Sequence, residues 1–125
     1  MLANSKAYSG FAVPDISKGL EFYRETLGLK TEVLDEENGL VTLHLAGDRP
    51  TLMYQSPSHS PASYTILNFP VEDVEATVDE LAERGVRFER YDEFDQDERG
   101  IVRTGGPRVA WFKDPFGNVL SVLED

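Results

Sequence analysis

The stretch that decides the fold is "FPVEDVEATVDELAERGV", residues 69–86. Its apolar side chains recur in steps of four and three, at Val74, Val78 and Leu81. This spacing places them on one face of a helix. Asp73 stands where a residue can accept hydrogen bonds from the free N–H groups at a helix start, and Gly85 stands where a helix ends. The segment predicts a strand that leads into an amphipathic helix.

The same pattern occurs earlier in the chain, in "FAVPDISKGLEFYRETLGL", residues 11–29. Asp15 corresponds to Asp73, and Gly28 corresponds to Gly85. The apolar residues of this copy are Ile16, Leu20, Tyr23 and Leu27. Strand-like runs follow each helix, so the chain is a tandem repeat with a period of about 55 to 60 residues.

Each copy is predicted to run strand, helix, strand, strand, strand. The first copy has strands near 7–13, 29–35, 40–46 and 51–55, and the second near 64–71, 86–91, 100–104 with 108–113, and 118–124. Such an α+β arrangement puts the helix on one face of a sheet and leaves the other face free. The chain is expected to be one domain over 1–125, with module one at 6–56, a connector at 57–62 and module two at 63–125.

Strand alternation predicts which side chains occupy the free faces. The residues expected to face the first helix are Phe11, Val13, Val41, Leu43 and Leu45. If Met53 belongs to the core, its neighbours Leu52 and Tyr54 face the other side of the sheet. The residues expected on the free faces are Tyr8, Gly10, Ala12, Thr42, His44, Leu52, Tyr54, Ile66, Asn68 and Pro70. Tyrosines, a histidine and an asparagine on one surface indicate a candidate ligand site.

The chain ends in a predicted hairpin, "AWFKDPFGNVLSVLE", residues 110–124. If Trp111 lies opposite Ser121, both occupy the free face and Phe112 packs under a helix. If the turn is one residue tighter, the two aromatic residues exchange roles.

Two further features leave alternatives open. His44 is a general acid or base, a hydrogen-bonding wall residue or an exposed strand histidine, whereas His59 lies in the connector. In "RYDEFDQDERG", residues 90–100, Tyr91 and Phe94 form either a lid that stacks on a planar or cationic ligand or part of a solvated loop.

Charge and composition exclude several classes of function. The 23 acidic and 12 basic residues give a formal charge of -11, which opposes binding to nucleic acid and to anionic membranes. This acidity serves solubility or attracts cationic ligands. The chain has no cysteine, and with no signal-like or membrane-spanning apolar run it is expected to be cytoplasmic.

Together, residues 11–29, 69–86 and 110–124 resemble the vicinal oxygen chelate superfamily of glyoxalase I, extradiol dioxygenases, and fosfomycin and bleomycin resistance proteins. The resemblance implies two βαβββ modules whose curved mixed sheets surround a cleft, with the helices outside. It further implies a homodimer, the assembly common in this superfamily. It also implies four inward side chains, mostly His, Glu or Gln, that hold one divalent ion. It favours the alternative that places Trp111 in the pocket.

The positions that the resemblance assigns to this ion are Tyr8, Leu52, Ile66 and Ser121. None is a usual metal ligand, and a register slip at the third position, to Tyr64 or Asn68, supplies none. We therefore expect no metal and no other cofactor.

The predicted function is binding of a small organic ligand in an aromatic cleft without a catalytic metal, as in bleomycin resistance proteins. The candidate ligands include organic cations. The expected ligand-binding residues are Tyr8, Leu52, Tyr54, Ile66, Asn68, Trp111 and Ser121. The alternative is a glyoxalase-like lyase or isomerase in which His44, with Tyr8 or Tyr54, moves protons.

Overall fold

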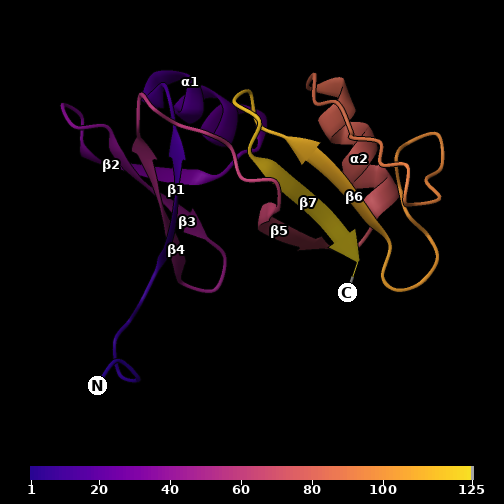
Figure 1. The fold of residues 1–125 in the computed structure, drawn as a ribbon, viewed down its shortest axis with the longest axis horizontal. Coiled ribbons are helices and arrows are strands. Elements are labelled where there is room, and N and C mark those ends of the chain that lie inside the picture. The colour runs from indigo at the N-terminus through magenta and orange to yellow at the C-terminus, as the bar shows by residue number, and fades with distance from the viewer. Residues whose placement is uncertain (125) are drawn as a thin grey trace. The chain divides into compact units, whose positions relative to one another are not determined.

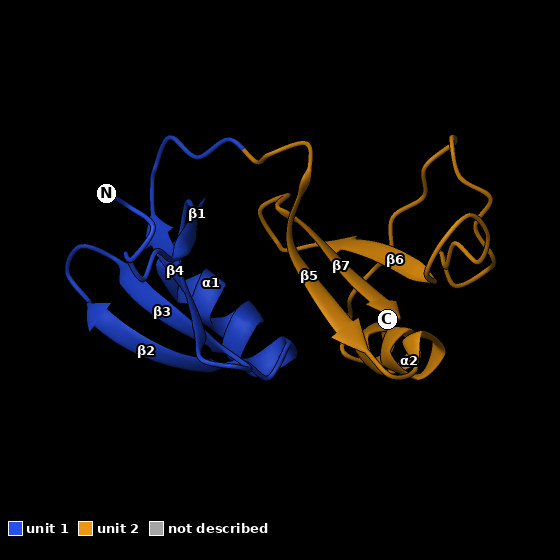
Figure 2. Cartoon of the chain, turned by 90° about the horizontal axis from the view of Figure 1, so that it is seen from below, with its two compact units in different colours: residues 1–60 blue, residues 61–125 orange. Residues whose placement is uncertain are grey.

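Each copy of the repeat forms its own sheet in the computed structural model, which describes residues 1–124. The chain divides into two units, Met1–Ser60 and Pro61–Asp125, shown in blue and orange in Figure 2. Both units combine a mixed sheet with a helical segment, which confirms the predicted α+β class.

The first unit contains a four-stranded sheet in the order β1-β4-β3-β2 (Figure 1). Strand β1 is parallel to β4, and the other neighbours are antiparallel. Its elements are β1 (Ser9–Val13), α1 (Ile16–Leu20), the π-helix η1 (Glu21–Thr26), β2 (Lys30–Asp35), β3 (Leu40–Leu45) and β4 (Arg49–Gln55).

The second unit contains a three-stranded sheet in the order β5-β7-β6. Strand β5 is parallel to β7, as β1 is to β4, and β6 is antiparallel to β7. Its elements are β5 (Thr65–Val71), α2 (Val74–Glu83), β6 (Val109–Lys113) and β7 (Val119–Glu124). The equivalent parallel pairing in both units is what the tandem repeat predicts.

Both helices begin in the same way. The side chains of Asp15 and Asp73 accept hydrogen bonds from backbone N–H groups in the first turn of α1 and α2, as predicted. The last residues of the closing strands add a second cap. Gln55 Oε1 accepts from the N–H of Ile16 at 3.0 Å, and Glu124 Oε2 accepts from that of Val74 at 3.0 Å. Each closing strand is thereby attached to its helix start.

The periodicity of the first helical segment predicted one continuous α-helix, and this prediction is wrong. After Leu20 the helix widens into η1, where the N–H of Leu27 bonds to the carbonyl of Phe22, five residues back, at 2.9 Å. Tyr23 is fully buried in this segment, and its ring centroid lies 5.3 Å from that of Phe11. The wider turn keeps this aromatic side chain in the core.

The helix-facing sides of the sheets form the cores, and the predicted alternation is confirmed for most strands. In the first unit the buried apolar strand residues are Phe11, Val13, Val41, Leu43 and Met53, whereas Leu45, also predicted for the core, is only half-buried. In the second they are Ala110, Phe112, Leu120 and Val122, which are buried together with Val74, Val78 and Leu81 of α2. Strand β7 is buried on both faces, because Val119 and Ser121 are buried as well. Leu52 and Tyr54 flank the buried Met53, so they face away from the core.

Two predicted strands of the second copy are wrong. The run near 86–91 contributes only a single bridge, from Phe88 to Phe112, and the run near 100–104 contributes bridges from Val102 to Gln96 and Val109. The intervening loop combines a few backbone hydrogen bonds, such as that from the N–H of Asp97 to the carbonyl of Ile101, with bonds between the side chains of Gln96 and Asp97 and the backbone. Among the described residues, no helix is long and apolar enough to cross a membrane.

Candidate functional site

A row of three side chains crosses the second sheet on the face opposite its core. Ser121 of β7 pairs with Trp111 of β6 on one side and with Asn68 of β5 on the other. The predicted pairing of Trp111 with Ser121 is therefore confirmed, and Phe112 is the core residue of β6. Ser121 is fully buried and donates a hydrogen bond of 2.6 Å from Oγ to Asn68 Oδ1.

Ile66 is separated from this row by a register shift. The pairing of β5 with β7 steps from Thr65 opposite Val119 to Leu67 opposite Leu120, so Ile66 is the extra residue of a bulge. Asn68, and not Ile66, is consequently the neighbour of Ser121. A bulge of this kind is not visible in the hydrophobic pattern, because it depends on pairing between strands.

Three rings form an aromatic cluster at the β6 end of the row: Trp111, Tyr91 and Phe94. The ring of Phe94 stacks on that of Trp111, with centroids 5.1 Å apart and an interplanar angle of 26°. The ring of Tyr91 contacts Trp111 edge-on, with centroids 5.5 Å apart. Phe94 keeps 44% of its surface exposed. The loop aromatics thus cover Trp111 while one of them remains accessible to solvent.

The loop that carries these rings is held by the amide of Gln96. Its Nε2 donates to the carbonyls of Glu89 at 2.9 Å and Gly100 at 2.7 Å, and its Oε1 accepts from the N–H of Tyr91 at 2.7 Å. The sequence left open whether residues 90–100 form a lid or a solvated loop. The structure shows an ordered loop with two of its aromatics on Trp111; whether it moves over a ligand stays a prediction.

Asp97 fixes the other half of this loop. Its Oδ1 accepts from the N–H groups of Arg99 and Ile101, both at 2.9 Å, and its Oδ2 accepts from Arg103. Burial alone raises the pKa of the Asp97 carboxyl. Hydrogen bonds from Ile101, Arg103 and Arg99 outweigh that effect and hold the pKa below its ordinary value of 3.8.

Asp97→Asn is expected to lower the free energy of unfolding by about 2 kcal/mol at pH 7, because charge-assisted hydrogen bonds are weakened. A lowered pKa means that the stabilisation is complete above the ordinary value of 3.8 and is lost as the pH falls through the lowered one. Urea unfolding should therefore show wild type and variant converging between pH 7 and pH 3. Exposed Asp95→Asn is the matched control, and a gap that is the same at both pH values would contradict the role of the Asp97 charge.

The pKa of Tyr91 is raised by burial, and secondarily by the negative charge of Glu89. Its phenol is therefore neutral at physiological pH and available as a hydrogen-bond donor at the edge of the aromatic cluster.

In the first unit, the predicted site residues lie on the face away from the core. Leu52 is half-buried on β4, between Gly10 of β1 and Thr42 of β3. Tyr54 is 38% exposed and lies between Ala12 and Leu40. Tyr8 precedes β1 and is 65% exposed.

His44 is an exposed strand residue with a partner that the sequence did not indicate. Its Nε2 lies 3.1 Å from Oε1 of Glu32, which projects from the adjacent strand β2. The histidine side chain is 47% exposed and borders a hollow of about 590 Å³ at the end of the sheet. Tyr54 lies at the other end of β4, because His44 pairs with Pro50 and Tyr54 pairs with Leu40.

The four metal positions implied by the resemblance do not fit a divalent ion. Leu52 and Ile66 carry no donor atom, and the Ser121 hydroxyl is engaged by Asn68. Within residues 1–124, no group of three or more His, Asp or Glu side chains is arranged to hold a metal. Tyr8 alone is insufficient as a ligand set.

The chain matches the model of the Glyoxalase/Bleomycin resistance protein/Dioxygenase superfamily over residues 7–122. It is 32% identical to the uncharacterized protein YraH of Bacillus subtilis (strain 168), with 90% of this chain and 91% of the relative covered.

Two solved structures show the same fold. TnmS3, an antibiotic binding protein from Streptomyces sp. CB03234, is 27% identical with a TM-score of 0.70, and 97% of each chain is covered. The fosfomycin resistance protein FosX from Listeria monocytogenes has a TM-score of 0.73 at 14% identity, covering 98% of this chain and 93% of its own. The family match over nearly the whole length decides the assignment: this chain belongs to the Glyoxalase/Bleomycin resistance protein/Dioxygenase superfamily.

Proposed function

We propose that this protein binds a small planar organic ligand at the aromatic cluster, without a catalytic metal. The observation that carries the proposal is the stack of Phe94 on Trp111 beside the hydrogen-bonded Ser121–Asn68 pair. Aromatic walls provide most of the contact area in small-molecule sites, and a few polar groups fix the orientation. The exposed Phe94 can exchange its contact with Trp111 for a contact with the ligand.

The charge of the loop favours a cationic ligand. Asp92, Glu93 and Asp95 surround Phe94 in the sequence and are exposed, and the whole chain carries a formal charge of -11. A cation over the face of an aromatic ring is stabilised by the ring electrons and, here, by these carboxylates. The antibiotic-binding activity named for TnmS3 supports a ligand of drug size.

The absence of a suitable donor set supports binding without metal chemistry. Two of the four family positions, Leu52 and Ile66, have only hydrocarbon side chains. A ligand at the aromatic cluster would be held by stacking and hydrogen bonding, which need no ion.

Trp111→Ala is expected to weaken binding of bleomycin, used as a cationic probe with a planar aromatic part, about fivefold to 150-fold, since a lost aromatic stack is worth about 1–3 kcal/mol. Calorimetry gives the dissociation constant, and fluorescence of Trp111, the only tryptophan, reports the contact in the wild type. Tyr64→Ala, at an exposed position outside the cluster, is the matched control.

A neutral anthraquinone serves as a second probe. Binding of bleomycin should weaken with added salt, whereas binding of the neutral probe should not. Equal affinity of wild type and Trp111→Ala for both probes would refute the proposal, as would one equivalent of Zn, Ni or Mn retained per chain and required for binding.

The second candidate is a lyase or isomerase that works without a metal, and one observation favours it. Glu32 Oε1, at 3.1 Å from Nε2, is placed to orient the imidazole of His44. Turnover of a glyoxalase substrate by chelator-treated protein, lost in His44→Ala and reduced in Glu32→Gln, would support this candidate over simple binding.

A further inference from the structure

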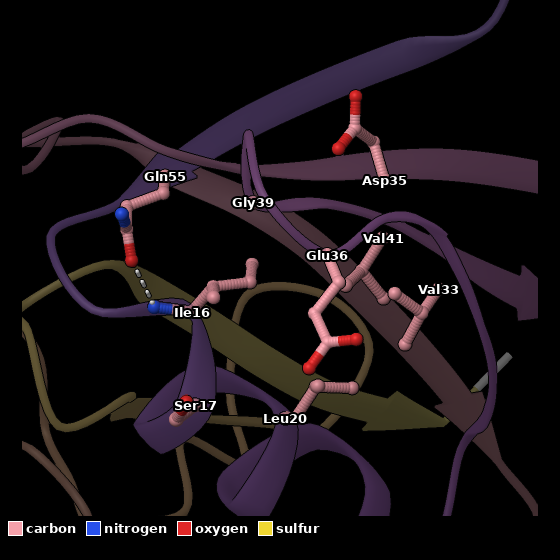
Figure 3. Close-up of a pocket in the computed structure, with 9 residues that line it drawn as sticks. All are labelled: Ile16, Ser17, Leu20, Val33, Asp35, Glu36, Gly39, Val41 and Gln55. Carbon is pink, nitrogen blue, oxygen red and sulfur yellow. Dashed lines mark hydrogen bonds between the residues drawn. The ribbon is translucent and has the colours of Figure 1, made fainter.

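A hollow of about 520 Å³ lies on the helix side of the first sheet (Figure 3). It is formed by α1, the strands β2 and β3 and the turn between them. Its lining residues are Ile16, Ser17, Leu20, Val33, Asp35, Glu36, Gly39, Val41 and Gln55. The volume falls within the range of small-molecule sites.

The hollow exists because the helix is drawn toward β1 and β4. Gly19 of α1 approaches so closely that a Cβ there would lie 3.1 Å from Met53 Sδ and 3.3 Å from Val13 Cγ2. The outer strand β2 is left uncovered at the other side of the same face. Val33 pairs with the buried Val41, yet 48% of its own surface is exposed. A core-facing valine therefore remains open to solvent.

Apolar side chains from two elements line this opening. Figure 3 shows Leu20 and Ile16 projecting from the helix and Val33 and Val41 projecting from the strands. Gln55 is fixed by its hydrogen bond to the N–H of Ile16 and cannot fill the space. Covering Val33 and Leu20 would remove apolar surface from water, which favours an apolar occupant.

The charge of the lining is negative. The Glu36 side chain extends from the turn toward Leu20 in Figure 3. Among the described residues, Glu36 makes no hydrogen bond and no ion pair, whereas the carboxylate of Asp35 accepts from the N–H and side-chain amide of Asn38. No basic residue lines the hollow. The unpaired charge of Glu36 is therefore available to an incoming group.

We infer that this hollow binds an amphiphilic organic cation, with its hydrocarbon part against Leu20 and Val33 and its ammonium group at Glu36. The inference is independent of the proposed function, because it uses a different unit and different side chains. The ammonium is selected by charge and the hydrocarbon part by apolar contact, so neither a metal ion nor a neutral alcohol meets both requirements.

The test is a titration of isotope-labelled protein with n-hexylammonium, followed by amide chemical shifts. Shifts are expected at the lining residues of α1 and β2. Glu36→Gln should weaken the affinity about fivefold or more, because the charge partner is removed. Glu37→Gln changes the same charge one residue away, outside the lining, and should change the affinity less than twofold. Uncharged n-hexanol should bind more weakly than the cation.

A second pair of variants tests the apolar part. Val33→Lys places a cation in the hollow and should abolish the amide chemical-shift changes caused by n-hexylammonium. Leu34→Lys is the control: Leu34 is 54% exposed and lies on the other side of the strand, so the shift changes should remain. Both positions are exposed, so folding should persist. Unchanged affinity in Glu36→Gln and Val33→Lys, or shifts centred outside the lining, would overturn the inference. Trp111→Ala should bind n-hexylammonium at the hollow with wild-type affinity. The test of the hollow is therefore independent of whether the aromatic cluster binds a ligand.

Discussion

Asp114→Ala is expected to lower the free energy of unfolding by about 3–5 kcal/mol, because one buried carboxylate organises the whole turn between β6 and β7. Asp114 is 4% exposed. Its Oδ1 accepts from the N–H groups of Phe116 and Asn118, both at 2.9 Å, and its Oδ2 accepts from Asn118 Nδ2 at 2.8 Å. Alanine removes these acceptors and leaves the buried amide of Asn118 without this partner.

Chemical denaturation of wild type and variant measures this loss. Asp114→Asn keeps one carbonyl acceptor and should lie between wild type and alanine. Asp92→Ala, at an exposed position, should change stability by less than about 0.5 kcal/mol. An alanine variant at position 114 as stable as the Asp92 variant would show that the turn is held by the backbone alone.

The same turn also decides where Trp111 is placed. Gly117 adopts a φ of 93°, and a Cβ there would lie 3.1 Å from Pro61 Cγ. With the turn closed in this form, Trp111 pairs with Ser121 and Phe112 pairs with Leu120. A defect at Asp114 should therefore reach the proposed ligand site through the strand register.

The repeat and the faces of most strands could be predicted because local patterns determine them. Asp15 and Asp73 mark the helix starts, and the alternation around Met53 assigns one face to the core. These features depend on residues that are neighbours in sequence. The family resemblance rests on the same segments, and the family match confirms it.

The remaining features depend on contacts between distant residues. The bulge at Ile66 is set by pairing with β7, and the π-helix that buries Tyr23 is set by packing against Phe11. Residues 86–91 have a strand-like composition, but Gln96 satisfies the backbone carbonyl of Glu89 and competes with a ladder. Hydrophobic periodicity contains no information on such side-chain caps.

In the candidate site, too, the features set by local sequence were predicted, whereas those set by contacts between distant residues were not. Trp111 and Ser121 were placed together by hairpin register, and the stack of Phe94 on Trp111 was not resolvable from the sequence, which left the loop open. Glu32 could have been found by extending the alternation of β2 beside His44, since the two are diagonal neighbours. The hollow at Glu36 has no sequence signal, because it results from the lateral position of α1 over the sheet.

Phe112→Ala and Trp111→Ala are expected to differ in stability although the two aromatic residues are adjacent. Phe112 is 1% exposed, and its ring centroid lies 5.5 Å from that of Phe88, so its loss should cost about 3–5 kcal/mol. Trp111 lies on the opposite face with partial exposure, and its loss should cost only about 1–2 kcal/mol. Urea unfolding of the two variants measures the difference, and Phe112→Leu, which fills most of the core volume, should recover more than half of the loss. The reverse order would mean that the turn is one residue tighter and that Trp111 is the core residue, in which case the aromatic cluster could not serve as a ligand surface.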